Sequence, residues 1–246
     1  MPRFFVAGEN IDREGGKAFI IGDDARHIAR SLRMAVGDGI TLSDGEGAEF
    51  VCELLRIRDE ECEAKILSES RGATEPPSDI TLFMAYPKGD KLELIVQKAV
   101  ELGASKIVPF ISERCIKRPQ ADRQDKQTAR LSRIAYEASK QCGRSRIAKV
   151  EGPIQYKEVC QKFAEYSLVL FCYEGEGTES IKSVLENCKC PESIAVIVGS
   201  EGGFSDSEAR SALDAGARLV GLGPRILRCE TAPDYCLAAL SYAFEM

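Results

Sequence analysis

Histidine is almost missing from this chain of 246 residues, which contains His27 and no other. A metal site built on two histidines is therefore excluded, and we expect no bound metal. A Ser-His-Asp triad would have to use His27, which lies far along the chain from the glycine-rich segments considered below. Hydrolytic and metal-dependent reactions are accordingly the least supported by the composition.

Long apolar runs are missing as well. No stretch approaches the roughly 20 consecutive apolar residues that a membrane-spanning helix needs. The N-terminal residues 1–6 hold too few apolar side chains for a secretory signal. With 44% hydrophobic and 29% charged residues, the sequence predicts a globular, cytoplasmic protein without a membrane partner.

Cysteine is plentiful, but the spacings that would give it a structural role are absent. Among ten cysteines no Cys-x-x-Cys pair occurs, and the pair Cys188-x-Cys190 has poor spacing for zinc and no histidine nearby. The chain is also far larger than scaffolds that depend on disulfides. We therefore expect reduced thiols that are mostly buried.

A net charge of −6 at pH 7 argues against a nucleic-acid partner until the charge is resolved along the chain. Residues 114–149 hold eleven lysines and arginines against three acidic residues, a local charge of +8. A basic segment in an acidic protein is typical of a phosphate-binding surface. A solvated helix face without a partner is the alternative.

Two domains are predicted. A linker over residues 71–78 contains two consecutive prolines, which forbid a helix. Residues 1–70 alternate between apolar and polar positions, with a turn at 43–47, and predict a small antiparallel β-barrel. A helix over residues 23–34 would place three arginines on one face, suited to phosphates or simply exposed to solvent (Arg26, Arg30 and Arg33).

Residues 79–246 predict an α/β domain. Apolar strands alternate with helices, which is typical of a parallel sheet covered on both faces. The expected strands are residues 80–85, 106–110, a short one near Ile147, 168–172, 193–198 and 217–222. The expected helices begin near Lys88 and cover residues 125–142, 157–163, 178–186 and 231–244, besides one after Ser205.

Glycines follow the last two strands, at residues 199–203 and 221–223. Ser205 and Glu208 form a capping box for the helix after the first of these segments. Ligands of open parallel sheets bind beyond the carboxyl ends of the strands, so the two loops could wall one pocket. Ordinary strand-to-helix turns are the alternative. Neither a P-loop nor an early Gly-x-Gly-x-x-Gly fingerprint is present.

Sequence blocks in a fixed order extend the pattern over nearly the whole chain. They are residues 3–5, 27–33, 37–38, 87–91, 98–103, 113–114 with 117–118, 137–144, 199–203 and 222–232. On these blocks the chain resembles the SPOUT superfamily of knotted RNA methyltransferases and, within it, the RsmE family. That family methylates N3 of a uridine in 16S ribosomal RNA.

The resemblance implies a PUA-like β-barrel followed by a parallel-sheet SPOUT domain with a deep trefoil knot. It also implies a homodimer, S-adenosylmethionine bound in the knot, and 16S ribosomal RNA of the small subunit as partner. The expected cofactor contacts are Gly199, Ser200, Glu201, Gly202, Gly203, Gly221, Leu222, Gly223, Ile226, Leu227, Thr231 and Ala232. Two departures stand out: Ser200 replaces a proline common in the family, and Pro233-Asp234 interrupts an alanine-rich stretch.

Methyl transfer from a sulfonium needs donor and acceptor held in line, but neither a metal nor a nucleophilic residue. Uridine N3 carries a proton that must leave, so a base or a cation that lowers its pKa is required. We expect Arg228 to stabilise the developing uridine anion, oriented by Glu230, with Arg225 as the reserve candidate. Capping of the last helix is the alternative role for Glu230.

Basic residues of both domains are expected to contact RNA phosphates. They are Arg3, Arg26, Arg30, Arg33, Lys88, Arg114, Lys117, Arg118, Arg133 and Arg144. The apolar last helix, with Cys236, Leu237 and Leu240, covers either a second subunit or its own sheet. Two other functions stay open: a noncatalytic RNA-binding or assembly protein, and a SPOUT methyltransferase with another base or a ribose hydroxyl as target.

Overall fold

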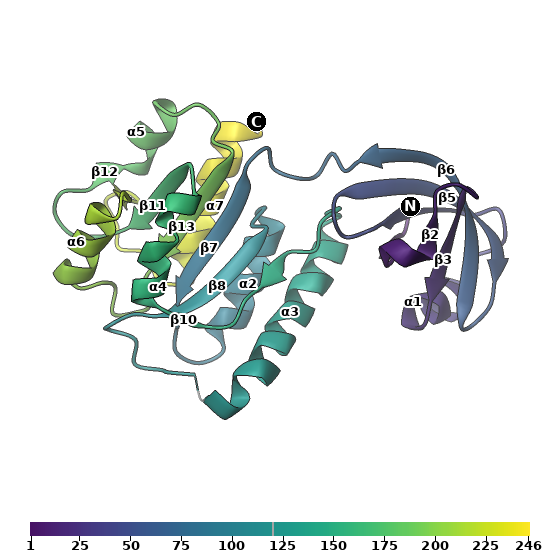
Figure 1. The fold of residues 1–246 in the computed structure, drawn as a ribbon, viewed down its shortest axis with the longest axis horizontal. Helices are drawn as coiled ribbons and strands as arrows, with labels where there is room; N and C mark the ends of the chain where they lie inside the picture. The colour runs from purple at the N-terminus through teal and green to yellow at the C-terminus, as the bar shows by residue number, and fades with distance from the viewer. Residues whose placement is uncertain (120) are drawn as a thin grey trace. The chain divides into compact units, whose positions relative to one another are not determined.

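The computed structural model of the chain describes residues 1–119 and 121–246. The chain divides into two compact units (Figure 1). Unit 1 comprises Met1–Glu75 and Ser139–Ile147, and unit 2 comprises Pro76–Ala138 and Ala148–Met246. The sequence predicts a division around Pro76, but it does not predict that residues 139–147 return to unit 1.

Unit 1 is built on one six-stranded sheet with the order β1-β4-β5-β6-β3-β2. All neighbours are antiparallel except β1 and β4, which run parallel. The expected β-barrel domain is thus present as a curled half-barrel. Its strands are β1 (Arg3–Phe5), β2 (Ile11–Asp12), β3 (Lys17–Ile21), β4 (Gly39–Ser43), β5 (Ala48–Ile57) and β6 (Glu61–Arg71), with a 3-10 turn η1 at Gly8–Asn10.

The core of unit 1 follows from strand alternation. In the middle of β5, the alternate residues Phe50, Cys52 and Leu54 are fully buried. They pack with Phe4 and Ile28, among others, in one apolar cluster. The β5–β6 pairing shifts register twice, which bends these long strands around that cluster.

The helix of unit 1 is shorter than expected. α1 covers Asp23–Arg26 and continues as a π-helical turn, η2, over His27–Ser31. Arg33 lies beyond the helix with a φ of 50°, so the three arginines do not form the predicted row. Arg26 pairs with Asp23 and Arg30 pairs with Asp59, although both arginines remain exposed.

Part of the predicted linker is fixed to unit 1, because Glu75 forms hydrogen bonds with residues of that unit. Its carboxylate accepts hydrogen bonds from the Arg144 guanidinium at 2.7 Å and from the N–H groups of Ser145 at 2.9 Å and Arg146 at 3.0 Å. Arg144 is only 3% exposed. We therefore revise the expected role of Arg144 from a phosphate contact to a buried ion pair.

We expect Glu75→Gln to lower the free energy of unfolding by about 2 kcal/mol, because a neutral amide loses the charge-assisted bonds. Burial opposes the charged form of Glu75, but Arg144 and the two N–H groups outweigh it and hold its pKa below 4.5. The contribution is therefore complete above pH 4.5 and is lost as the pH falls through the lower folded value.

Denaturant titrations at neutral pH and in acid measure this difference. Glu69→Gln, in the exposed pair with Arg13, is the control and should cost almost nothing. A Glu75→Gln difference that persists undiminished in strong acid would contradict the prediction.

Unit 2 is a parallel sheet with the order β10-β8-β7-β13-β11-β14-β12, and β9 also pairs with β8. Its strands are β7 (Asp79–Ala85), β8 (Lys106–Ile111), β9 (Lys149–Val150), β10 (Ile154–Gln155), β11 (Leu168–Cys172), β12 (Glu179–Ser180), β13 (Ser193–Val198) and β14 (Arg218–Gly221). Every pairing is parallel, as predicted.

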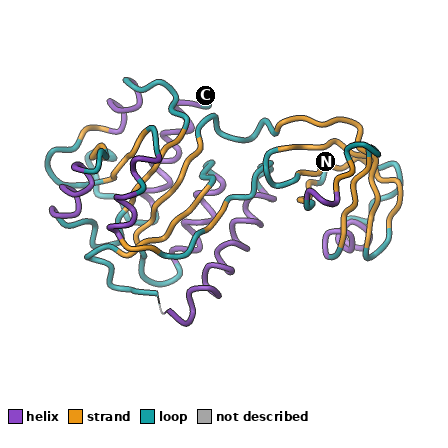
Figure 2. The backbone as a smooth tube through the Cα atoms, viewed as in Figure 1, coloured by secondary structure: helices purple, strands orange, loops and turns teal. Residues whose placement is uncertain are grey.

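Helices cover both faces of this sheet (Figures 1 and 2). α7 packs between α2 and α5, while α4 lies in front of the sheet and α6 stands at the left edge of the unit in Figure 1. The helices are α2 (Lys91–Glu101), α3 (Gln124–Gln141), α4 (Tyr156–Gln161), α5 (Ile181–Glu186), α6 (Asp206–Asp214) and α7 (Thr231–Phe244), with 3-10 turns η3 (Ala121–Arg123) and η4 (Phe163–Glu165).

Predicted boundaries differ from the structure mainly at helix starts. α2 begins at Lys91 rather than Lys88, and the short strand β12 precedes α5, which begins only at Ile181. α7 has the predicted bounds and accommodates Pro233 in its first turn, where a missing N–H costs no helical bond. Its residues Cys236, Leu237 and Leu240 are buried within unit 2.

The structure tests two further predictions, that the cysteines are reduced and mostly buried and that no helix spans a membrane. All ten cysteines are free thiols, but only five are buried, and Cys190 is exposed. Among the described helices, none is long and apolar enough to cross a membrane.

Candidate functional site

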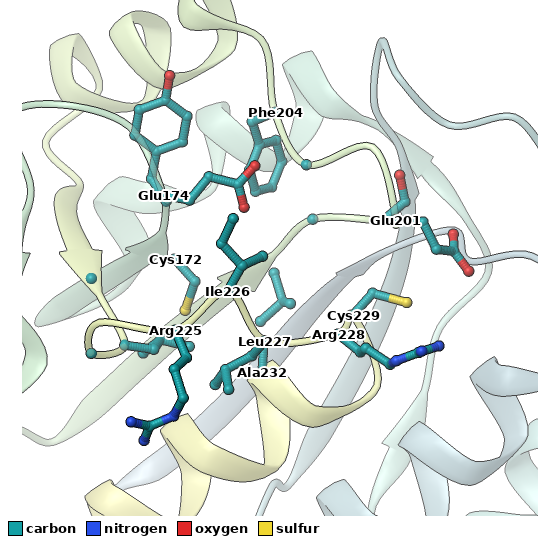
Figure 3. Close-up of a pocket in the computed structure, with 18 of the residues that line it drawn as sticks. Cys172, Glu174, Glu201, Phe204, Arg225, Ile226, Leu227, Arg228, Cys229 and Ala232 are labelled. Atoms are coloured by element: carbon teal, nitrogen blue, oxygen red, sulfur yellow. The ribbon is translucent and has the colours of Figure 1, made fainter.

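A pocket of about 460 Å³ opens in unit 2 where strands β13, β11 and β14 end (Figure 3). Because β11 lies between β13 and β14, the loops that follow all three strands meet at one place. The region beyond the carboxyl ends of parallel strands is where open α/β sheets bind ligands. The prediction that both glycine-rich loops wall one pocket is confirmed.

The first loop, residues 199–204, turns back sharply after β13. The N–H of Gly203 donates to the carbonyl of Ser200 at 2.9 Å. A Cβ atom on Gly199 would lie 3.1 Å from the Cα of Gly203 and 3.2 Å from the ring of Phe204. A side chain at Gly199 would therefore force the backbone of Gly203 and the ring of Phe204 to shift by a few tenths of an ångström, which favours glycine there.

The predicted capping box holds the end of this loop. Ser205 Oγ accepts from the N–H of Glu208, whose carboxylate accepts from the N–H of Ser205 at 3.0 Å. The same carboxylate accepts from the N–H of Glu113 at 2.8 Å, and Arg114 donates to the carbonyl of Gly202 at 3.2 Å. The basic segment after β8 is thereby attached to the first glycine loop.

Phe204 forms an apolar wall of the pocket. Its ring lies 4.2 Å from that of Phe171 and stacks over Phe110 at 6.2 Å, centroid to centroid. Val198 and Leu227 add further apolar lining. Flat apolar walls with a few polar groups around them suit a ring system such as a nucleobase.

The second loop runs from Leu222 to Glu230 and joins β14 to α7. Gly223 has a φ of +104°, which favours glycine. Ile226 is 84% exposed, and Figure 3 shows its side chain extending toward Glu174. Arg225 and Arg228 point to opposite sides of the loop in that view. Neither arginine forms an ion pair within the described part of the chain.

Three charged side chains meet at the edge of the pocket. The Nζ atom of Lys91 lies 3.1 Å from a carboxylate oxygen of Glu201 and 3.0 Å from one of Glu230. Glu230 makes no side-chain capping bond to α7, so its alternative role as a helix cap is wrong. Its expected bond to Arg228 is also not formed; the carboxylate accepts from Lys91 instead.

These contacts set the protonation of the cluster. The hydrogen bond from Lys91 lowers the pKa of Glu230 to about 2. Burial, together with the bond to Glu230, raises the pKa of Cys229 to about 12. The bonds that Lys91 donates to Glu230 and Glu201 raise the pKa of Lys91. At neutral pH neither Glu230 nor Cys229 is therefore a good proton acceptor.

Most of the residues predicted for the cofactor or for the chemistry line the pocket. They are Gly199, Ser200, Glu201, Gly203, Gly221, Leu222, Gly223, Arg225, Ile226, Leu227, Arg228 and Ala232. Gly202, Thr231 and Glu230 lie outside the lining. The N–H groups of Thr231 and Ala232 both donate to the carbonyl of Arg228 at 2.9 Å, which fixes the end of the loop at the start of α7.

Sequence reasoning missed the third wall. Cys172 ends β11, Tyr173 and Glu174 follow it, and Thr178 precedes β12. Lys91 lies in the sequence block 87–91, but the block alone predicts no role for it. These residues could be placed only by knowing that β11 lies between the two glycine-loop strands, which the order of strands along the chain does not reveal.

The residues predicted to bind RNA divide into two groups. In unit 1, Arg3 pairs with Glu49, and Arg144 is buried as described above. In unit 2 the predicted residues are all exposed: Lys88, Arg114, Lys117, Arg118 and Arg133. Lys117 Nζ donates to the carbonyl of Gly89 at 2.8 Å. Lys88, Arg114 and Lys117 thus belong to loops that contact one another or the first glycine loop.

Acidic and thiol side chains do not form a metal centre here: in residues 1–119 and 121–246, no group of three or more His, Cys, Asp or Glu side chains is suited to hold an ion.

Comparison with known proteins agrees with this architecture. Residues 74–241 match the model of an RNA methyltransferase domain, and residues 20–67 match an RNA methyltransferase PUA domain. The chain is 30% identical to the ribosomal RNA small subunit methyltransferase E of Bacillus subtilis, over 100% of this chain and 98% of that protein.

Two solved structures are similar to the chain over nearly its full length. The ribosomal RNA small subunit methyltransferase E of Neisseria gonorrhoeae, bound to S-adenosyl methionine, has a TM-score of 0.83 and 33% identity, covering 99% of this chain and 98% of that chain. A methyltransferase of Legionella pneumophila with bound cofactor SAM has a TM-score of 0.81 and 30% identity, covering 98% and 97%. The chain therefore belongs to the RsmE family of RNA methyltransferases, in which a PUA domain accompanies the methyltransferase domain.

Proposed function

We propose that this protein transfers a methyl group from S-adenosylmethionine to N3 of a uridine in 16S ribosomal RNA of the small subunit. The observation that carries the proposal is the pocket formed by both glycine loops at the carboxyl ends of β13, β11 and β14, in a member of this family. The cytoplasmic location and the knotted path of the chain are part of the same proposal.

The residues of the pocket fit such a cofactor. The apolar lining at Val198, Phe204 and Leu227 suits the adenine ring. Ser200 Oγ is buried and has no hydrogen-bond partner in the described structure, so a bound ligand would satisfy it. Glu174 brings an exposed carboxylate to the lining, suited to hydroxyl or ammonium groups. Backbone groups at Gly199 and Gly223 allow close approach.

The bound cofactor would supply an electrophilic methyl group on its sulfonium. The residues of this chain would hold the acceptor and stabilise the charge that develops on the uracil ring. Arg228 is suited to that task, because it is one of the lining residues and its guanidinium has no ion-pair partner among the described residues. Since Glu230 is held ionised by Lys91, we assign the loss of the N3 proton to a pKa lowered by Arg228 rather than to Glu230 acting as base.

Modification mapping of 16S ribosomal RNA from a strain lacking the gene tests the target. A uridine that has lost its N3 methyl group, and regains it with the purified protein and S-adenosylmethionine, is expected. Loss of a methyl group from another base or from a ribose would favour the second SPOUT reading. Failure of the protein to bind S-adenosylmethionine at all would favour a noncatalytic RNA-binding protein.

RNA affinity should fall steeply with rising salt, because phosphate contacts release counterions. We expect Arg133→Glu, on an exposed position of α3, to weaken RNA binding and to flatten the salt dependence while S-adenosylmethionine affinity stays unchanged. Arg210→Glu, exposed on α6, is the charge-matched control. RNA affinity that is flat across a tenfold range of salt would make the basic segment a solvated surface.

We also propose a homodimer that buries the outer side of α7. Tyr242 is 75% exposed and Tyr235 is exposed as well, whereas Leu237 and Leu240 pack into unit 2. Exposed aromatic residues on one helix are typical of an interface. Sedimentation equilibrium should therefore give twice the chain mass of 26.9 kDa, and Tyr242→Glu should shift the equilibrium toward monomer. A mass of 26.9 kDa for the wild type at micromolar concentration would rule out a stable dimer.

A further inference from the structure

Lys91 joins both glycine loops through a single ammonium group. It is the first residue of α2 and lines the pocket. Glu201 comes from the loop after β13, and Glu230 from the loop after β14, and each carboxylate lies within 3.1 Å of Nζ. The N–H of Lys88, just before α2, also donates to Glu201 at 3.2 Å. The start of α2 thus holds both loops at once.

We propose that Lys91 is a positioning residue that clamps the two glycine loops together and forms the cofactor pocket in advance of binding. The inference rests on the function proposed above. Without the ammonium group, the two carboxylates would face each other and repel, and the loops would separate. Forming a site in advance favours binding because less ordering is left to occur when the ligand arrives.

The clamp also explains why Arg228 has no ion-pair partner in the described structure. Glu230 is two residues from Arg228 in the sequence, and Glu201 pairs with the same ammonium group as Glu230. Lys91 occupies both carboxylates and leaves the guanidinium available for a substrate. Removing Lys91 should therefore affect turnover as well as cofactor affinity.

The charges of the cluster make the proposal testable. Its titratable groups are Lys91, Glu201, Glu230 and the thiol of Cys229, which is neutral at pH 7. Removing the ammonium group makes the site more negative, so direct attraction alone would tighten the binding of a cationic ligand. Loss of the clamp weakens binding instead. The two explanations predict changes of opposite sign.

Calorimetry with S-adenosylmethionine, which carries a sulfonium, and S-adenosylhomocysteine, which does not, distinguishes them. Lys91→Met should lower the affinity for both ligands by roughly tenfold, and Lys91→Arg should restore most of the lost affinity. Lys98→Met is the matched control. Lys98 lies on the same helix, its Nζ atom pairs with Glu101 at a distance of 2.8 Å, and neither residue lines the pocket. The control should bind both ligands as the wild type does.

The pH profile separates the clamp from a general loss of structure. In Lys91→Met, one of the two carboxylates gains a proton as the pH falls below neutral and can then donate a hydrogen bond to the other. Affinity for S-adenosylhomocysteine should therefore recover in mild acid in this variant and stay flat in the wild type. The double variant Lys91→Met/Glu230→Gln removes the repulsion and should recover part of the affinity at neutral pH.

Wild-type affinity in Lys91→Met for both ligands, or tighter binding of S-adenosylmethionine alone, would overturn the clamp. The clamp would also be overturned if Lys91→Met binds S-adenosylhomocysteine weakly at every pH and Glu230→Gln does not restore the affinity. A wild type that binds neither ligand would overturn the proposed function instead, so the two failures are distinguishable.

Discussion

Gly223→Val is expected to abolish binding of S-adenosylmethionine. Gly223 lines the pocket with a φ of +104°, a conformation that a β-branched residue adopts only under strain. The variant must either move the second glycine loop or place its side chain in the cofactor's space. Calorimetry with the purified variant measures the loss.

Gly216→Val is the matched control for this variant. Gly216 has a φ of +95°, and, as at Gly223, a Cβ atom there would meet nothing within 4 Å, but it ends α6 outside the pocket. Both variants carry backbone strain of about 1–3 kcal/mol, so both should lose stability while only Gly223→Val loses the cofactor. Equal affinity in the two variants would remove the second loop from the cofactor site.

Arg228→Lys is expected to slow single-turnover methylation of a saturating ribosomal substrate on the order of a hundredfold. Lysine keeps the charge but loses the planar fork that can donate two parallel hydrogen bonds. Because Arg228 makes no ion pair in the described structure, the substitution leaves no carboxylate unpaired. Affinities for cofactor and RNA should therefore change little, and the effect should lie in the rate.

Arg225→Lys and Arg210→Lys complete this experiment. Arg225 lines the pocket from the other side of the second loop, and Arg210 lies on α6 outside the pocket. If Arg225→Lys methylates slowly and Arg228→Lys methylates at the wild-type rate, the proposed role belongs to Arg225. Wild-type rates in both would show that the developing charge is stabilised elsewhere.

Local features of the fold were predictable because they depend on neighbouring residues. The alternation at Phe50, Cys52 and Leu54, the capping box at Ser205 and Glu208, and the bounds of α7 all follow from short-range patterns. The π-helical turn at His27–Ser31 was not predictable in this way. Arginines spaced as on an ideal helix did not reveal that the helix ends before Arg33.

Features that depend on long-range pairing were not predictable. Glu230 precedes a helix and follows an arginine closely, so sequence offered helix capping or a bond to Arg228. Its actual partner, Lys91, lies 139 residues earlier in the chain. The buried pair of Arg144 with Glu75 is of the same kind, since a basic segment gives no sign of which arginine is enclosed. Side-chain type indicated the chemistry of the pocket, but only the fold determines the partners.

The position of β13 has a consequence for how the protein comes to be folded. β13 lies between β7 and β11, and its pairing partners Ile80 and Ile194 are 114 residues apart in the chain. During synthesis, one edge of β7 therefore stays unpaired until β13 has left the ribosome. Unpaired strand edges favour aggregation. Closing so long a loop is also slow. A chain destined to modify ribosomal RNA thus completes the centre of its catalytic sheet only near the end of its own translation.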